Sequence, residues 1–166
     1  MYGNGRNSAE STVSNNMADI KSPEERSRNM AAIRSKDTKP EVYLRKLLFS
    51  AGYRYRKNVS YIYGHPDLWL AKYNTAIFVH GCFWHRHEGC KYAYTPKSRE
   101  EFWNKKFSVN IQRDKAVKEE LARQGIRQLI IWECTIERTK RQFERQTDLL
   151  NNICVFLQST DHYSEL

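Results

Sequence analysis

The most informative segment of the chain is residues 67–80, which read DLWLAKYNTAIFVH. Two apolar stretches, 68–71 and 76–79, flank a Tyr73-Asn74 pair that is typical of a turn. The segment therefore predicts a hairpin of two buried strands, with Asp67 as the first residue of the first strand.

Helices and further strands are expected on both sides of this hairpin. Upstream, two capping signatures predict helices at about 22–34 and 38–51, and residues 53–57 alternate as in a half-exposed strand. Downstream, a capping box at Ser98 predicts a long helix that ends at Gly125. A buried strand at 126–133 and a last helix at about 139–157 should follow.

This order of elements predicts the α/β class, with a mixed central sheet flanked by helices. Residues 1–20 are rich in Gly, Asn and Ser and are expected to be a flexible leader. The folded domain should cover residues 21–157, and residues 158–166 should form a loose tail.

The chain has 166 residues with a net charge of +9, and 40% of its residues are hydrophobic. That composition supports a folded core, and the positive charge favours an anionic partner such as nucleic acid, although a membrane surface would also fit. No apolar run is long enough to span a membrane, and the first residues lack the apolar core of a signal peptide. We therefore expect a soluble, cytoplasmic protein whose four cysteines are reduced.

Residues 80–90, HGCFWHRHEGC, contain three of the five histidines and two of the four cysteines. Cys82, His87 and Cys90 are spaced so that one metal ion can bind all three, and Cys134 could reach them if its strand lies beside the 76–79 strand. Together they predict a closed Cys3His zinc site with a structural role. The alternative is a group of buried thiols with a surface histidine. Cys154 lies on an apolar helical face and is expected in the core.

Asp67 is the first candidate for phosphodiester chemistry. A hard cation such as Mg²⁺ could bind between its carboxylate and a backbone carbonyl near Val79, with His85 as the base that activates water. An aspartate at this place is more often a turn or cap residue, so the structural alternative stays open.

The long helix carries a second candidate. Six residues share one of its faces, and two of them, Asn110 and Asp114, are polar. Asp114 is expected to point at His80 and hold its tautomer. The alternative is that both polar side chains simply bond to loops.

These residues together resemble the very-short-patch repair (Vsr) mismatch endonucleases, which belong to the restriction-endonuclease-like PD-(D/E)xK superfamily. The resemblance covers residues 25 to about 135, and its most specific motif is H-G-C-F-W-H-x-H at positions 80–87. It implies a restriction-endonuclease-like fold and an enzyme that hydrolyses the phosphodiester 5′ of the thymine in T·G mismatches, which arise from 5-methylcytosine deamination.

The resemblance also implies a role for each matching residue. Asp67 and the Val79 carbonyl would hold Mg²⁺, His85 would activate water with help from Glu41, and His80 and Asp114 would form a supporting acid pair. Glu41 also fits a capping box, which leaves a purely structural role open for it. The zinc ligands would be Cys82, His87, Cys90 and Cys134, and the residues that wedge into or bind DNA would be Phe83, Trp84, Trp103, Met30 and Asn110.

A second hypothesis, from another class, is a non-catalytic DNA-binding module stapled by zinc. The surplus of Asp67, His80, His85 and Asp114 beyond the zinc ligands favours an enzyme. The expected partner is double-stranded DNA bound by a monomer, with accessory repair proteins possible. Residues 21–57 hold 11 basic and 4 acidic side chains, so much of the excess charge lies in the leading helices.

Overall fold

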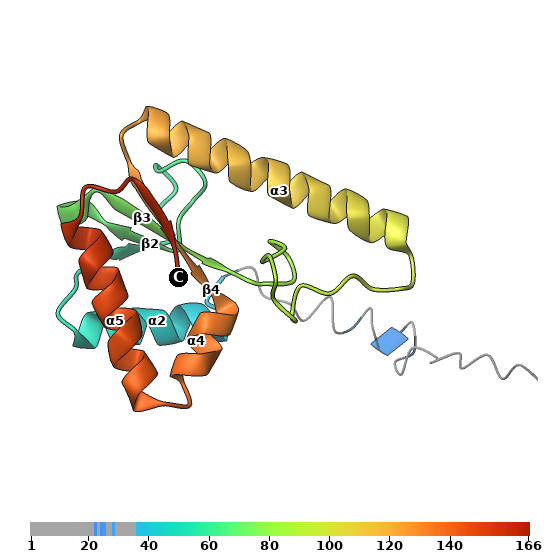
Figure 1. Ribbon diagram of the computed structural model, residues 1–166. Coiled ribbons are helices and arrows are strands. Elements are labelled where there is room, and N and C mark those ends of the chain that lie inside the picture. The colour runs from blue at the N-terminus through green and yellow to red at the C-terminus, as the bar shows by residue number, and fades with distance from the viewer. Residues whose placement is uncertain (1–21, 23, 26–27, 29–35) are drawn as a thin grey trace, which may run out of the picture. The chain divides into compact units, whose positions relative to one another are not determined.

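A five-stranded mixed sheet forms the centre of the computed structural model, which describes residues 22, 24–25, 28 and 36–166 (Figure 1). The chain divides into two units, Met1–Arg34 and Ser35–Leu166, and the sheet belongs to the second. The strands are hydrogen-bonded in chain order. They are β1 (Arg56–Lys57), β2 (Leu68–Leu70), β3 (Thr75–His80), β4 (Arg127–Trp132) and β5 (Tyr163–Glu165).

The predicted hairpin is confirmed as the antiparallel pair β2 and β3, in which Leu68 lies opposite Ile77. A short 3₁₀ helix, η1 (Ala71–Tyr73), connects the strands and ends at Asn74 in the left-handed conformation, with φ 47°. The Asn74 side chain donates a hydrogen bond of 2.8 Å to the carbonyl of Gly125. The turn therefore also anchors the end of the long helix.

Helices cover both faces of the sheet. On one face lie α2 (Lys39–Ser50), α4 (Glu133–Thr139) and α5 (Phe143–Gln158), and on the other lies α3 (Glu100–Arg123) (Figure 1). Alternate strand residues feed two separate cores: Ile77 and Leu129 pack with α2 and α5, whereas Phe78 and Ile130 pack with α3. The expected α/β class with a flanked mixed sheet is confirmed.

The connection through α3 sets the position of the site. It makes β3 and β4 parallel neighbours, with Ile77 opposite Leu129 and His80 opposite Trp132. Both strands therefore end at the same edge of the sheet. Cys134 follows directly after β4, so it is brought beside the loop that follows β3, as expected.

The C-terminal residues correct one expectation. Residues 158–166 are not a loose tail, because β5 pairs in parallel with β4 and Leu166 exchanges backbone bonds of 2.9 Å with Ile130 and Trp132. A strand of mostly polar residues carries no hydrophobic signal in the sequence. Backbone hydrogen bonds hold it at the edge of β4, and Tyr163 and Leu166 pack against the two hydrophobic cores.

Two helix boundaries also differ from expectation. The long helix begins at Glu100, and its N-cap is Arg99 with φ 57°, so Ser98 does not cap it. The expected helix at 139–157 is α5, which begins four residues later, at Phe143. A separate short helix, α4, directly follows β4 and was not expected. The capping box of Thr38 and Glu41 at the start of α2 is confirmed.

The first unit is described only in part. Ser22 and Glu25 exchange the two hydrogen bonds of the expected capping box, at 3.0 and 3.2 Å. The expected leader at residues 1–20, most of the first helix and Met30 lie outside the described residues. None of the helices that the structure describes has the length and apolar character needed to cross a membrane.

Candidate active site and metal centre

Asp67 bonds across the hairpin instead of capping a local turn. Its Oδ2 accepts a hydrogen bond of 2.7 Å from the backbone N–H of Val79, because the antiparallel pairing of β2 and β3 brings these residues together. Burial raises the pKa of Asp67 to about 6, against the opposing effect of the Val79 hydrogen bond. The negative charge of Glu41 adds to the rise, so two carboxylates face one small region. A cation placed there would relieve both burial and repulsion.

His85 is held by Asp114. The Nδ1 atom of His85 and the Oδ2 atom of Asp114 lie 2.6 Å apart, and both side chains are mostly buried. A carboxylate accepts, so Nδ1 carries the proton and Nε2 is left as the basic nitrogen. The expectation that Asp114 would hold His80 is therefore wrong: the turn of the loop after β3 brings His85, and not His80, onto the α3 carboxylate.

His80 stacks on His85 instead. The ring centroids are 3.7 Å apart and the planes differ by 12°. Burial lowers the pKa of His80 to about 3, and the neighbouring His85 contributes in the same direction. His80 is accordingly neutral near pH 7, and its ring supports one face of the His85 imidazole.

His80, His85 and Asp114 also bring their donor atoms within 4.8 Å of one another, which raises the question of a metal site. The stacked rings argue against one in this arrangement. Imidazole lone pairs lie in the ring plane, so two nearly parallel rings direct them side by side and not at one point. The group is better suited to holding and moving a proton.

Glu41 lies at the start of α2 with both carboxylate oxygens engaged. Oε1 accepts from the Thr38 hydroxyl at 2.7 Å, and Oε2 accepts from the backbone N–H of Asp37 at 2.9 Å. The side chain is buried and close enough to Asp67 to raise its pKa. The capping role is thus confirmed, and it places a carboxylate beside Asp67.

The four expected zinc ligands do converge. Donor atoms of Cys82, His87, Cys90 and Cys134 all lie within 4.8 Å of one another. His87 Nδ1 is 3.6 Å from the sulfur of Cys82 and 3.4 Å from that of Cys134. In tetrahedral zinc sites, bond lengths of about 2.3 Å to sulfur and about 2.0 Å to nitrogen put these atoms about 3.5 Å apart. The donor set and its spacing fit a four-coordinate zinc ion.

The environment acts in opposite directions on two of these thiols. Burial raises the pKa of Cys82 to about 12, whereas, against the opposing effect of burial, hydrogen bonds with the Tyr92 backbone and the neighbouring thiols lower the pKa of Cys90. Cys154, on α5, lies outside the group, and it is half-buried instead of in the core where it was expected. No position is left in the Cys3His set for a substrate.

An aromatic cluster lies beside the histidines and joins the loop after β3 to the first half of α3. Phe83 is at its centre, with ring centroids 5.1 to 5.4 Å from those of four neighbours, namely Trp84, Tyr94, Trp103 and Phe107. Asn110 donates a 3.0 Å hydrogen bond to the carbonyl of Trp84, which fixes the loop on the helix. Phe83, Trp84 and Trp103 are only half-buried, so part of each side chain is accessible to solvent.

The N-terminal part of this arrangement, residues 18–91, matches the family model of DNA mismatch endonuclease Vsr. A type II nicking enzyme of Neisseria meningitidis serogroup A, V.NmeAIP, is 42% identical over 137 residues, which cover 82% of this chain and 97% of the relative. The chain belongs to the Vsr family. A type II nicking enzyme of Xanthomonas oryzae, V.XorIIP, is 42% identical over 72% of this chain and 88% of its own. The DNA mismatch endonuclease Vsr of Escherichia coli is 39% identical over 83% of this chain and 89% of its own.

Membership in the Vsr family confirms the resemblance stated from the motifs, and with it a DNA endonuclease of restriction-endonuclease-like fold. A nuclease of this kind works with a divalent metal ion, and the Asp67 region and the Cys3His group are two places in the described part of the chain that could hold ions. A DNA substrate also accounts for the net positive charge of the chain.

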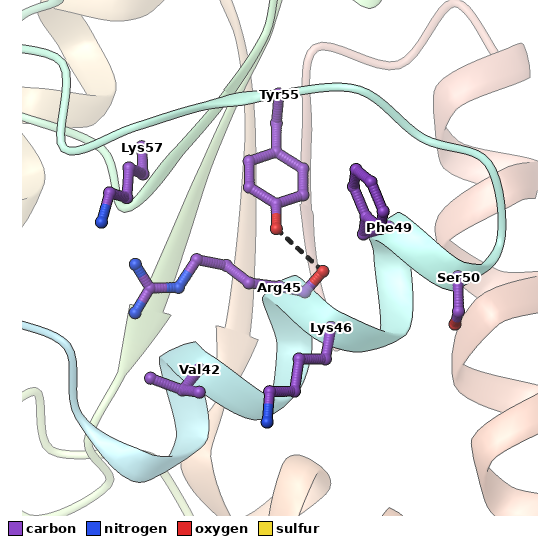
Figure 2. Close-up of a pocket in the computed structure, with 7 residues that line it drawn as sticks. All are labelled: Val42, Arg45, Lys46, Phe49, Ser50, Tyr55 and Lys57. Carbon is purple, nitrogen blue, oxygen red and sulfur yellow. Dashed lines mark hydrogen bonds between the residues drawn. The ribbon is translucent and has the colours of Figure 1, made fainter.

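Sequence reasoning missed a basic groove of this Vsr-family chain between α2 and β1. It has a volume of about 390 Å³, and Figure 2 shows the residues that line it. Three of them are cations, and none is a carboxylate. Arg45 pairs with Asp37 at 2.6 Å, whereas Lys46 and Lys57 are exposed. The lining residues are Val42, Arg45, Lys46, Phe49, Ser50, Tyr55 and Lys57. The only signal in the sequence was the charge of residues 21–57.

Two aromatic partners were also missed. Tyr94 and Phe107 complete the cluster around Phe83, and the guanidinium of Arg86 lies 4.3 Å from the centre of the Phe107 ring. Phe107 follows Trp103 by one helical turn. This spacing in the sequence predicted that Phe107 lies on the buried face of the helix, but it did not predict its partner in the loop. The contact with a loop more than twenty residues away required the tertiary structure.

Proposed function

We propose that this Vsr-family endonuclease cuts one strand of double-stranded DNA, at the phosphodiester 5′ of the thymine in a T·G mismatch produced by 5-methylcytosine deamination. The observation that carries the proposal is a partly buried Asp67 close enough to the His85–Asp114 pair for the charge of His85 to act on the pKa of Asp67. The relatives support it by name, since one is called a DNA mismatch endonuclease and others are called type II nicking enzymes.

Asp67 would hold Mg²⁺ together with the main-chain carbonyl of Val79. The fit rests on hard oxygen donors and on the raised pKa of Asp67, which reflects a buried carboxylate that a cation would stabilise in its charged form. The Val79 N–H fixes Oδ2, and Oδ1 accepts no hydrogen bond within the described part of the chain. When bound, Mg²⁺ supplies charge stabilisation at the phosphoryl oxygens and the leaving group.

His85 would take the proton from the attacking water at Nε2. Asp114 holds the other ring nitrogen, which sets the tautomer and stabilises the imidazolium that forms. His80 stacks on the ring and, being neutral, adds no competing charge. Glu41, beside Asp67, would orient the water through its carboxylate oxygens while it continues to cap α2.

The Cys82, His87, Cys90 and Cys134 group would hold a structural Zn²⁺. The ligand geometry is closed, which excludes a substrate position, and the group ties the loop after β3 to the end of β4. That loop carries His85 and the aromatic cluster. Zinc would therefore hold the catalytic base and the DNA-facing aromatic side chains in position.

Recognition of the mismatch would use the aromatic cluster. Side chains of this size can wedge between base steps at a cost of a few kcal/mol, and mismatched steps unstack more easily. Phe83, Trp84 and Trp103 would enter one groove, and Met30 would approach the other. Asn110 would act with them at the DNA surface while it fixes the Trp84 carbonyl.

The DNA backbone would meet the positive charge of the leading helices and of the groove between α2 and β1. One chain would act as a monomer, on the nucleoid in the cytoplasm, and accessory repair proteins would act on the nicked product. A non-catalytic binding module would need neither the buried Asp67 nor the His85–Asp114 pair.

Labelled duplexes with T·G or T·A at one position test the proposal, with the flanking sequence varied and Mg²⁺ present or omitted. Omission of Mg²⁺ is preferable to a chelator, because a chelator would also withdraw zinc. We expect one nick 5′ of the mismatched thymine, only with Mg²⁺. Equal cutting of T·G and T·A duplexes would overturn the mismatch specificity, and binding without cutting in every context would favour the binding module.

A further inference from the structure

Trp132, the last residue of β4, touches the metal centre and the C-terminal strand at once. Its indole ring stacks on the imidazole of His87, with centroids 4.1 Å apart and planes that differ by only 2°. Its Nε1–H donates a hydrogen bond of 2.9 Å to Oε2 of Glu165 in β5. One side chain therefore connects a carboxylate near the C-terminus to a zinc-ligating ring.

The Glu165 carboxylate is itself held in place. Its second oxygen accepts a hydrogen bond from the Tyr163 hydroxyl, and the ammonium of Lys118 lies 3.3 Å from the centre of the Tyr163 ring. The backbone of Leu166 bonds to both Ile130 and Trp132 at 2.9 Å. Although Glu165 lies at the surface, these contacts leave its carboxylate little freedom.

We infer that Glu165 is a positioning residue for the metal centre. By holding Trp132, it keeps the His87 ring in the plane in which Nδ1 faces the sulfurs of Cys82 and Cys134. A metal ion bound to imidazole must lie in the ring plane, so a ring fixed in advance loses less freedom on binding. The inference rests on the proposed zinc site, and it assigns a role to a strand that contributes no ligand.

The rate of zinc release from the full chain to a coloured chelator tests this role. We expect Glu165→Ala to release zinc about tenfold faster than the parent, at the lower end of the roughly 10- to 100-fold effects typical of groups that support metal ligands. Glu165→Gln keeps an oxygen that accepts from Trp132 and should stay within about twofold of the parent. The control Glu119→Ala removes an exposed carboxylate from α3, far in sequence from the ligands, and should behave like the parent.

Trp132→Phe completes the test, because phenylalanine keeps a stacking ring but lacks the N–H donor. It should release zinc as quickly as Glu165→Ala, and the double variant should be no faster than either single variant, since both remove the same hydrogen bond. Parent-like release from Glu165→Ala, equal release from the Gln and Ala variants, or additive effects in the double variant would each overturn the role of Glu165. A parent chain without bound zinc would instead overturn the proposed metal centre itself.

Discussion

The two aspartates of the candidate active site, Asp67 and Asp114, have different surroundings. Asp67 is a partly buried carboxylate whose pKa is raised by burial to about 6, whereas Asp114 is a carboxylate that pairs with an imidazole. This difference suits Asp67 to its proposed role as a ligand of a hard cation, and Asp114 to its proposed role of setting the tautomer of His85. Each role predicts a different result when the carboxylate is replaced by its amide.

Asp67→Asn should abolish nicking but retain binding to T·G duplexes. The amide can still accept from the Val79 N–H, so the hairpin should be preserved. Because burial and the Glu41 charge disfavour the charged form, the variant should unfold at an equal or higher temperature in buffer without Mg²⁺. Calorimetry together with a gel-shift assay measures both effects. A clear loss of thermal stability would make Asp67 a structural residue.

Asp114→Asn should slow nicking by about a hundredfold or more with little change in DNA affinity, because an amide can hold His85 in the wrong tautomer and cannot stabilise its charged form. Single-turnover rates with saturating enzyme measure the effect. Asp148→Asn, in α5, is the matched control and should cut at the parent rate. If both variants cut equally fast, His85 does not act through Asp114.

At the scale of the element, α2 has two separate roles along its length. Its first turn supplies Glu41 beside Asp67, and its second half supplies one wall of the basic groove opposite Lys57 of β1 (Figure 2). A strand of DNA cut near Asp67 would have further phosphates on either side of the cut. The groove offers exposed ammonium groups for them.

Replacing Lys46 and Lys57 by alanine should lower the salt dependence of DNA binding. Each phosphate that the protein no longer neutralises reduces the slope of log K against log salt by roughly one, so the slope of the double variant should fall by roughly two. Lys72→Ala is the control, because Lys72 is exposed in η1, at the opposite end of β3 from His80. An unchanged slope in the double variant would mean that the DNA backbone does not bind in this groove. That outcome would not contradict the proposed nicking activity, which is measured separately.

On the scale of the whole molecule, the Cys3His group joins the loop after β3 to the end of β4. The loop of residues 81–99 contains no helix or strand, and it carries both His85 and Phe83. A metal ion bound by the group would attach this loop to the end of β4 through Cys134, in addition to the contacts that His85 and Trp84 make with α3.

Cys90→Ser should release zinc and lower the free energy of unfolding by about 3 kcal/mol or more, because binding of structural zinc contributes directly to folding. Chemical denaturation and metal analysis of the purified chain measure the two effects. Cys154→Ser changes a thiol outside the group and should keep a full zinc content. Full zinc content in Cys90→Ser would remove Cys90 from the ligand set.

Local pattern was sufficient for much of this protein, because hairpins, helix caps and ligand spacing depend on residues close in the chain. The hairpin around Asn74, the α2 cap at Thr38 and the motif of positions 80–90 are of this kind. The closeness of Cys134 followed once a parallel β3–β4 pair was assumed. The family followed from the same motifs.

Contacts between distant segments needed the tertiary structure. Whether Asp114 meets His80 or His85 depends on how one loop turns over α3, and neither hydrophobic period nor spacing contains that information. The polar strand β5 was invisible because its partner, the edge of β4, exists only after folding. The link from Glu165 through Trp132 to His87 was also invisible in the sequence, since these residues come into contact only after β5 has paired with β4.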